Sequence, residues 1–399
     1  MIDVETSEAP SALLERVTEF LAEHPPAQMD RMDFLRARFA AGLAWVHYPV
    51  GLGGLGLDPS AQSAVDAAFA AAGAPDNHPR ANVVGLGMAA PTLLRYATPE
   101  QQKTWIPPLW TGQEVWCQLF SEPGAGSDLA GVGASAVRDG DDWIVNGQKV
   151  WTSLAHDARW ALLLVRSDPS LPKHQGLSYF VLDLRTPGVD IRPLRQMTGE
   201  AEFNEVYLDD VRVPDVNRLG AVGEGWAVTQ ATLMNERVAI GGSAVARESG
   251  PIGDLTDLWR TRPECRRPEA HYELMRLWTD AEALRLASVR LTQQLEVGAP
   301  GPEGSGLKLA YSALAQDSAS LQLDLLGSDA LRYDDWTLCR PDLSVPLDRV
   351  SGYWYLRRRA NSIEGGTSEI MRNIISERVL KLPAEPRVDK DIAWKDLPK

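Results

Sequence analysis

A carboxylate and a guanidinium stand side by side at Glu236 and Arg237, inside the run 225–242. The surrounding positions are mostly apolar, with Leu233, Met234, Val238 and Ile240 at helical spacing. Burial raises the pKa of a carboxyl group toward the range of a general base, and it also requires that the charge be paired. Two interpretations remain open for this pair: a structural ion pair at a helix interface, or a catalytic base.

A loop with two glycines follows an apolar run at Phe120-Ser-Glu-Pro-Gly-Ala-Gly-Ser-Asp128. Successive backbone N–H groups in such a loop can form a concave site for an oxyanion or a ring carbonyl. Ser121 and Ser127 add hydroxyl donors. The segment is equally compatible with a simple tight turn between strands.

Two further segments combine residue types that suit a cofactor. Asn146-Gly-Gln-Lys-Val-Trp-Thr-Ser153 places an indole and two hydroxyls after a predicted hairpin, which suits a flat aromatic ligand, although a core tryptophan is the alternative. Gly365 and Gly366 precede Thr367, a predicted helix N-cap with Glu369 in the first turn. Such a helix start suits a phosphate, and an ordinary capped helix is the alternative.

The elements that position these segments fall into several units, because 399 residues are too many for one ordinary core. Helical spacing predicts an N-terminal helical domain over 1–115 and a C-terminal four-helix bundle over 221–382. Short β-rich runs over 116–220 predict a middle antiparallel barrel or sandwich. The fold class is therefore α+β, and the charged segment 383–399 is expected to be a mobile tail. The long helices of the bundle are predicted at 226–248, 269–297, 303–326 and 367–380.

Composition excludes several function classes. A net charge of −14 argues against nucleic acid or an anionic membrane as the main partner. The three cysteines stand far apart, which fits a reducing cytoplasm and predicts neither a disulfide framework nor a metal site. No apolar run approaches the roughly 18 residues that a membrane span needs. Residues 51–56 match the pattern GxGxxG but lack the flanking strand and helix, so we interpret them as a surface loop.

The chain resembles the acyl-CoA dehydrogenase family over nearly its whole length. The segments that carry the resemblance are Ser-Glu-Pro-Gly-Ala-Gly-Ser-Asp128, Asn-Gly-Gln-Lys-Val-Trp-Thr-Ser153, Val-Arg-Val-Pro214, Gly-Glu-Gly-Trp226 and Gly-Gly-Thr-Ser-Glu-Ile-Met-Arg-Asn-Ile-Ile375. The resemblance implies an N-terminal helical domain, a middle β-domain and a C-terminal bundle with FAD between them. It also implies α,β-dehydrogenation of an acyl-CoA, with an electron-transfer flavoprotein as electron acceptor.

Carried over residue by residue, the resemblance implies a set of site residues. Phe120, Ser121 and Gly126 match the loop that lines flavin and thioester. Trp151 and Ser153 match the pair that contacts the flavin, and Thr367 and Glu369 match positions beside the diphosphate. The residues matched to the acyl-CoA side are Ser127 and Arg237.

The family's catalytic base occurs at one of two sequence positions. One lies directly before the Gly-Thr of the C-terminal motif, and here it is Gly365, which has no side chain, while Glu364 is one residue too early. The other lies on the bundle helix before the family's arginine, and here it is Glu236. The resemblance therefore implies Glu236 as the base, with Glu364 as the second candidate.

Two segments depart from the family pattern. Residues 252–267 replace the Arg-x-x-Phe-Gly that reaches the FAD of a neighbouring subunit, and Asp324-Leu-Leu-Gly-Ser328 replaces Gln-x-x-Gly-Gly. Arg266 or Arg267 could substitute for the missing arginine. A homodimer, a homotetramer and a heterotetramer with a related subunit all remain open. The alternative functions are an oxidase or flavin monooxygenase on the same fold, and a non-catalytic partner subunit.

Overall fold

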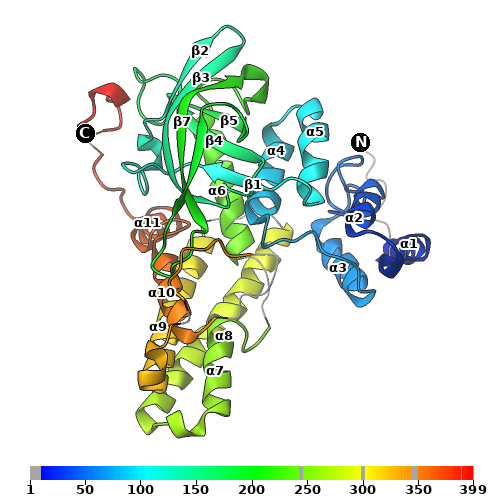
Figure 1. The fold of residues 1–399 in the computed structure, drawn as a ribbon, viewed down its shortest axis with the longest axis vertical. Helices are drawn as coiled ribbons and strands as arrows, with labels where there is room; N and C mark the ends of the chain where they lie inside the picture. The colour runs from blue at the N-terminus through cyan, green and yellow to red at the C-terminus, as the bar shows by residue number, and fades with distance from the viewer. Residues whose placement is uncertain are drawn as a thin grey trace.

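The computed structural model describes residues 10–241, 246–297, 302–333, 335–342, 349–387 and 389–398. Within these ranges, the side chains at positions 10, 236–241 and 295–297 are not described. Figure 1 shows the three parts of the chain: helices at the N-terminus, a curled sheet, and a long bundle of helices. The α+β class and the order of helices, strands and helices agree with the prediction.

The N-terminal part is helical. Its elements are α1 (Pro10–Glu23), α2 (Arg31–Ala40), α3 (Gln62–Ala71), a π-helical turn (Gly85–Ala89), α4 (Ala90–Tyr96) and α5 (Pro99–Trp110). The predicted cap of α5 is confirmed: Thr98 and Gln101 exchange side-chain and backbone hydrogen bonds as a capping box. The segment 51–56 forms turns, and a Cβ on Gly54 would lie 2.0 Å from the Tyr48 carbonyl oxygen. Close packing therefore explains a glycine in this loop.

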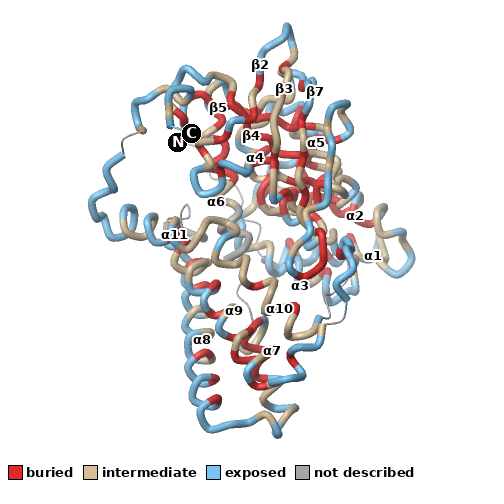
Figure 2. Tube along the Cα trace, turned by 60° about the vertical axis from the view of Figure 1, so that its left-hand side comes forward, coloured by how far each residue is buried: buried red, intermediate tan, exposed pale blue. Residues whose placement is uncertain are grey.

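The middle part is a seven-stranded sheet. Its strands are β1 (Trp116–Leu119), β2 (Ser135–Asp139), β3 (Asp142–Ser153), β4 (Trp160–Arg166), β5 (Leu177–Asp183), β6 (Val189–Leu194) and β7 (Phe203–Pro214). The strand order is β1-β4-β2-β3-β7-β6, with β5 also on β4. Most pairs are antiparallel, as predicted, whereas β4 pairs with β1 and β2 in parallel. β4 and β5 are buried almost throughout, as expected of strands covered on both faces. Figure 2 shows that buried residues concentrate in this sheet and in α4 and α5 beside it.

The C-terminal part is the bundle. Its helices are α6 (Gly225–Gly241), α7 (Pro251–Thr261), α8 (Pro268–Val297), α9 (Gly304–Leu326), α10 (Ser351–Arg358) and α11 (Ser368–Ile374), which continues as a π-helical turn (Ile375–Val379). α8 and α9 agree closely with prediction. The prediction of one helix to 248 was wrong, because α6 ends at Gly241 and a new helix, α7, begins after Gly250, whose φ is 64°. Pro251 occupies the first position of α7, where a missing N–H costs nothing.

The chain end differs from the predicted mobile tail. Residues 389–398 lie against the sheet domain, where the backbone N–H groups of Trp394 and Lys395 donate to the carbonyls of Leu171 and Pro169 at 2.9 and 3.0 Å. In Figure 1 the C-terminus accordingly reaches the sheet rather than the bundle. Charge and proline content predicted no contacts for this segment, whereas Asp389, Ala393, Trp394 and Lys395 all contact the sheet domain. Among the described helices, none combines the length and apolarity needed to cross a bilayer.

Candidate active site

A buried ion pair anchors the glycine-containing loop to β3. Lys149 is fully buried, and its Nζ donates to Glu122 Oε1 at 2.7 Å and to the Phe120 carbonyl at 3.0 Å. Glu122 also accepts the backbone N–H groups of Gly133 and Ala134 at 2.7 and 2.9 Å. One carboxylate therefore ties both ends of the loop to the strand that carries Trp151.

The pKa of Lys149 depends on both its burial and its carboxylate partner. Burial lowers the pKa of Lys149, and the neighbouring Glu122 carboxylate opposes that shift. A buried charge that loses its partner is costly, so each member of the pair holds the other in place. The N–H of Val150 also donates to the Ser121 carbonyl at 2.9 Å, which sets the two motif segments side by side.

Trp151 lies at the end of β3 in an unusual conformation. Its φ is 59°, a region that bulky residues rarely adopt, and its side chain is 58% exposed. The ring forms a T-shaped pair with Phe203 at 5.8 Å between centroids, and the residue still remains largely exposed. Strained backbone combined with an exposed aromatic residue is typical of a ligand-binding position. Ser153 follows it, half-buried and paired with Phe203 in the β3–β7 ladder.

Arg357 on α10 connects this wall to the C-terminal motif. Its guanidinium is 3.2 Å from the Glu364 carboxylate and 3.7 Å from Glu202, and it lies 5.7 Å from the centre of the Phe203 ring. Burial raises the pKa of Glu202, and Arg357 partly offsets the shift. The arginine therefore joins the sheet domain to the segment that precedes Gly365.

The C-terminal motif forms a tight turn and a capped helix. Gly365 and Gly366 have φ values of 63° and 94°, which favour glycine. Thr367 caps α11 by accepting the N–H of Ile370 at 3.2 Å, as predicted. Lys308 on α9 donates to the Gly366 carbonyl at 2.6 Å and brings a positive charge to this turn. Glu369 is exposed and paired with Arg372 at 3.3 Å.

The helix that carries Glu236 and Arg237, α6, is anchored by Thr232, which lies one turn before Glu236. Thr232 Oγ1 lies 3.0 Å from Thr92 Oγ1 on the N-terminal side and 3.1 Å from the Tyr179 hydroxyl on β5. α6 is thus fixed between the N-terminal helices and the sheet. The side chains of Glu236 and Arg237 lie outside the described residues, so their predicted roles remain predictions.

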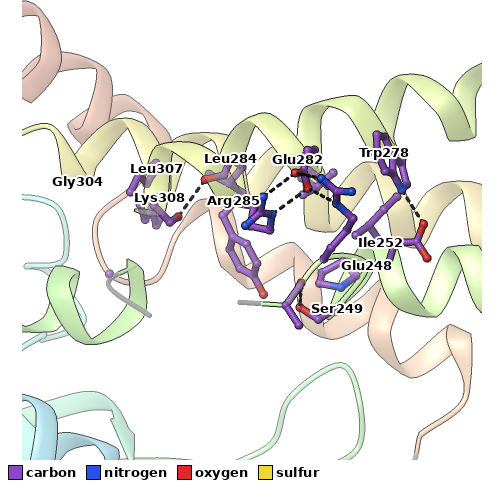
Figure 3. A pocket seen from close by; sticks show the side chains of 18 residues that line it. Glu248, Ser249, Ile252, Trp278, Glu282, Leu284, Arg285, Gly304, Leu307 and Lys308 are labelled. Atoms are coloured by element: carbon purple, nitrogen blue, oxygen red, sulfur yellow. Dashed lines mark hydrogen bonds and ion pairs between the residues drawn. The ribbon is translucent and has the colours of Figure 1, made fainter. Parts of the chain in front are cut away.

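A cavity opens in the bundle beside the C-terminal motif. It lies between α7, α8 and α9, and Gly365 contributes to its wall. Figure 3 shows Glu282 between two arginines at its edge; Arg247 and Arg285 each donate to Glu282 at 2.7 Å. Hydrogen bonds from Arg285 and Arg247 lower the pKa of Glu282 to about 2. The rest of the lining is largely apolar, with Ile252, Trp278, Leu284, Leu307 and Leu314 among its residues.

The two segments that depart from the family pattern meet at one place. Arg267 Nη2 donates to the carbonyl of Asp324 at 3.2 Å, and Arg266 Nε donates to the carbonyl of Trp259 at 2.8 Å. Both arginines therefore contact backbone of their own chain. No cluster of three or more metal-ligating side chains occurs in the described ranges. Cys117, Cys265 and Cys339 are free.

The structure joins most of the predicted site residues into two linked groups. Phe120, Ser121 and Trp151 belong to the group fixed by Lys149, whereas Thr367 follows the segment held by Arg357. Sequence reasoning missed Arg357 and Glu202 as site-forming residues, because neither lies in a motif. Lys149 and Glu122 were quoted within motifs but received no role. A lysine in an otherwise half-buried strand is a signal that could have revealed the pair.

Three family models match the chain in succession: the acyl-CoA dehydrogenase N-terminal domain over 7–113, the middle domain over 117–211 and the C-terminal domain over 223–380. The chain belongs to the acyl-CoA dehydrogenase family. Members of this family are flavoprotein oxidoreductases of lipid metabolism, and the chain is accordingly an oxidoreductase acting on acyl-CoA.

Individual acyl-CoA dehydrogenases refine the comparison. The chain is 40% identical over 354 residues to the acyl-CoA dehydrogenase IpdE1 of Mycobacterium tuberculosis, with 87% of each chain covered. It is similar to the Tcur3481-Tcur3483 steroid ACAD, with a TM-score of 0.72, 25% identity and coverage of 96% of this chain and 100% of that one. It is also similar to the ChsE4-ChsE5 complex from Mycobacterium tuberculosis, with a TM-score of 0.69, 27% identity and coverage of 96% and 100%.

Proposed function

We propose that this chain is an FAD-dependent acyl-CoA dehydrogenase that converts an acyl-CoA thioester to the trans-2-enoyl-CoA. The observation that carries the proposal is the hydrogen bond between Val150 N–H and the Ser121 carbonyl at 2.9 Å. It joins the segment that carries Trp151 to the loop that holds Gly126 and Ser127, which supports a shared site. One surface then offers a stacking wall and a polar loop, which are the features that a flavin and a thioester require.

The described residues fit FAD. The exposed indole of Trp151 suits a flat ring, and the turn at Gly366 and Thr367, which Lys308 contacts, suits a diphosphate. We assign Phe120, Ser121, Gly126, Trp151, Ser153, Thr367 and Glu369 to the cofactor. When bound, FAD supplies the acceptor for the hydride that leaves the substrate β-carbon.

We assign proton abstraction from the α-carbon to Glu236. The described part of α6 supports this assignment: Thr232, one turn before position 236, contacts both Thr92 and Tyr179 and anchors the helix between the N-terminal helices and the sheet. Glu364, the second candidate, is already engaged in an ion pair with Arg357 at 3.2 Å. Arg237 and Ser127 are assigned to the acyl-CoA.

The acyl group is proposed to be bulky and ring-bearing. The cavity between α7, α8 and α9 adjoins Gly365 and has a largely apolar lining. One of the structural neighbours is named a steroid ACAD. An apolar cavity that continues from the C-terminal motif suits a large hydrocarbon group better than a short chain.

We propose that the chain works in an oligomer with a related subunit, passes electrons to an electron-transfer flavoprotein and acts in the cytoplasm. Two observations support the oligomer. The segment 252–267 lacks the family's FAD-reaching arginine, and the similar ChsE4-ChsE5 structure is a complex of two proteins. Native mass spectrometry of the chain purified alone, and after co-expression with such a subunit, separates the homomeric from the heteromeric assembly.

The decisive experiment is an anaerobic titration of the purified, FAD-loaded protein with a panel of acyl-CoAs. The panel contains short, long, branched and ring-bearing acyl groups. We expect the flavin absorbance to bleach with at least one member, most completely with a ring-bearing one. A protein that cannot be loaded with FAD, alone or with its partner, refutes the proposal. Bleaching by short chains only would refute the proposed substrate class while leaving the activity intact.

Two matched variants test the base. Glu236→Gln should retain FAD and lose about 10²-fold or more of its reductive rate, because a general base contributes on that order. Glu364→Gln removes the same charge directly before the two glycines and should retain most of the rate. The reverse ranking would move the base to Glu364.

A further inference from the structure

The last described segment, residues 389–398, forms a strap on the sheet domain. Its Ala393 bridges to Pro172, and the backbone N–H groups of Trp394 and Lys395 donate to carbonyls of the 169–171 turn. Residues 377–387 before it are all exposed, so the strap is connected to the end of the bundle by a solvated linker. The described segment 389–398 thus lies on the domain that carries the glycine-containing loop.

Trp394 covers the end of that loop. Its Nε1 donates to the Gly131 carbonyl at 3.1 Å, and its ring lies 4.5 Å from the Arg166 guanidinium carbon. A methyl group at Gly133 would lie 3.3 Å from the ring, which shows how closely the indole packs on the backbone. Gly133 is also the residue whose N–H binds Glu122.

Arg166 connects Trp394 to the backbone of the buried segment 130–132. It is 2% exposed, and it donates to the carbonyls of Val132 and Ala130 at 3.0 and 2.6 Å. The Trp394 ring therefore covers the outer side of the buried Arg166 guanidinium. The hydrogen bonds of that guanidinium fix the backbone of 130–132. The loop is held from inside by Lys149 and Arg166, and from outside by the strap.

A second contact reaches the end of the motif itself. Lys173 binds Asp128 at 2.8 Å and Asp389 at 2.5 Å, and its side chain is only 9% exposed. Asp128 closes the segment 120–128 and directly follows Ser127. The lysine therefore links the first residue of the strap to the residue beside a proposed acyl-CoA contact.

We propose that residues 389–398 are a positioning element of the active site, with Trp394 and Asp389 as positioning residues. The strap restricts the loop 121–134 to the conformation that binds FAD and acyl-CoA. Trp394 acts on the half of the loop tied to Glu122, and Asp389 acts through Lys173 on the half that carries Ser127. The proposal rests on the proposed function, because it takes the loop as the cofactor and substrate site.

The first test measures the loop without any ligand. Hydrogen exchange of the full-length apoprotein is compared between wild type, Trp394→Ala and Ile392→Ala, a control that removes an exposed apolar side chain two residues away. We expect exchange across 121–134 to become about tenfold faster in Trp394→Ala alone, as the loss of one hydrogen bond and a cation–π contact predicts. Unchanged exchange in that loop overturns the proposal, whether or not the protein binds FAD.

The second test measures the consequence for the site. The Kd of FAD, from titration of the apoprotein, should rise about tenfold in Trp394→Ala, and Trp394→Phe should recover part of it because a ring again covers Arg166. A purely structural role would lower the apoprotein melting temperature without changing this Kd. Wild type that binds no FAD, alone or with its partner subunit, refutes the proposed function, whereas equal Kd values for wild type and Trp394→Ala refute the strap's role alone.

The ion pair between Lys173 and Asp389 is tested with a matched pair of variants. Asp389→Asn breaks the bridge through Lys173, while Asp391→Asn removes the same charge from an exposed position two residues later. We expect Asp389→Asn to raise the KM for acyl-CoA about threefold with kcat unchanged, in line with the loss of one partly buried ion pair. Equal KM values for the two variants would show that Lys173 does not transmit the strap's position.

Discussion

The sheet domain and the bundle use charge in different ways. In the sheet domain Lys149 is 0% exposed and its partner Glu122 is 11% exposed, and the pair fixes the loop around the proposed flavin site. On α8 of the bundle, Arg276 is 45% exposed and lies near Glu273, Asp280 and Asp317 at 3.3 to 3.8 Å. The first pair is buried and has three backbone partners, the Phe120 carbonyl and the N–H groups of Gly133 and Ala134, whereas the second group faces water.

This difference shows where the geometry of the site is specified. Desolvated charges are expensive, so a chain that buries them must satisfy every hydrogen-bonding atom with a defined partner. That requirement fixes the backbone between 120 and 134 relative to β3. Solvated ion pairs fix little, because water replaces them at small cost. Substitutions in the two regions should therefore differ in size by nearly an order of magnitude.

The largest effect is expected for Lys149→Met. The change leaves the Glu122 carboxylate buried without its cation, and removing one partner of a buried pair costs about 3–5 kcal/mol. The free energy of unfolding, from urea denaturation followed by tryptophan fluorescence, should fall by that amount. FAD binding should weaken in parallel. If the free energy of unfolding falls by less than about 1 kcal/mol, the Lys149–Glu122 pair contributes no more than a surface ion pair. The sheet domain and the bundle would then not differ in how much their charges contribute to stability.

The double variant Lys149→Met/Glu122→Gln provides the control. It removes both charges, so it should be more stable than Lys149→Met alone, because no unpaired charge stays buried. A double variant that is simply the sum of two losses would show that the two residues do not act as a pair.

An intermediate effect is expected for Arg357→Met. The variant leaves Glu202 and Glu364 facing each other without the guanidinium between them, and we expect a loss of about 1–3 kcal/mol in unfolding free energy. Because Arg357 packs over Phe203 and Phe203 packs on Trp151, the fluorescence of the exposed indole should also change. Arg372→Met, which removes an exposed arginine from α11, is the matched control.

The ion pairs of Arg357 with Glu202 and Glu364 illustrate what the sequence could not predict. α8 and α9 were predicted within a residue because long helices repeat an apolar pattern many times. The capped start of α11 was predicted because Thr367 and the two glycines form a local signal. Arg357 has no such signal: its partner Glu202 belongs to another domain, and only the folded chain brings them together. α7 was missed because residues 252–267 follow no pattern of the family, and the strap was missed because its position depends on contacts of Asp389 and Trp394 with residues far away in the sequence.

A smaller effect, visible through pH, is expected for Glu202→Gln. Burial raises the pKa of Glu202 in the folded protein above its ordinary value near 4.3, so the folded state holds this proton more tightly than the unfolded state. Its contribution to stability is therefore present at low pH and is lost as pH rises from about 4.3 through the raised value. Glu202→Gln should remove that decline, so its stability relative to wild type should improve as pH rises. Urea denaturation of both proteins between pH 4 and 8 measures this difference in unfolding free energy, and Glu273→Gln, on the solvated face of α8, is the control substitution.

The smallest effect is expected for Arg276→Ala, and it is the strictest test of the comparison. Three carboxylates surround this guanidinium, so a count of ion pairs would rank it above Lys149. Its exposure predicts the opposite: solvent already screens each pair, and the side chain regains rotational freedom when they break. Unfolding free energy should change by less than about 0.5 kcal/mol, and the change should vanish at 1 M salt. A loss above about 1 kcal/mol that persists at high salt would mean that α8 is desolvated in the working protein. The outer face of the bundle would then be a subunit interface, and the contrast between the two regions would belong to the isolated chain alone.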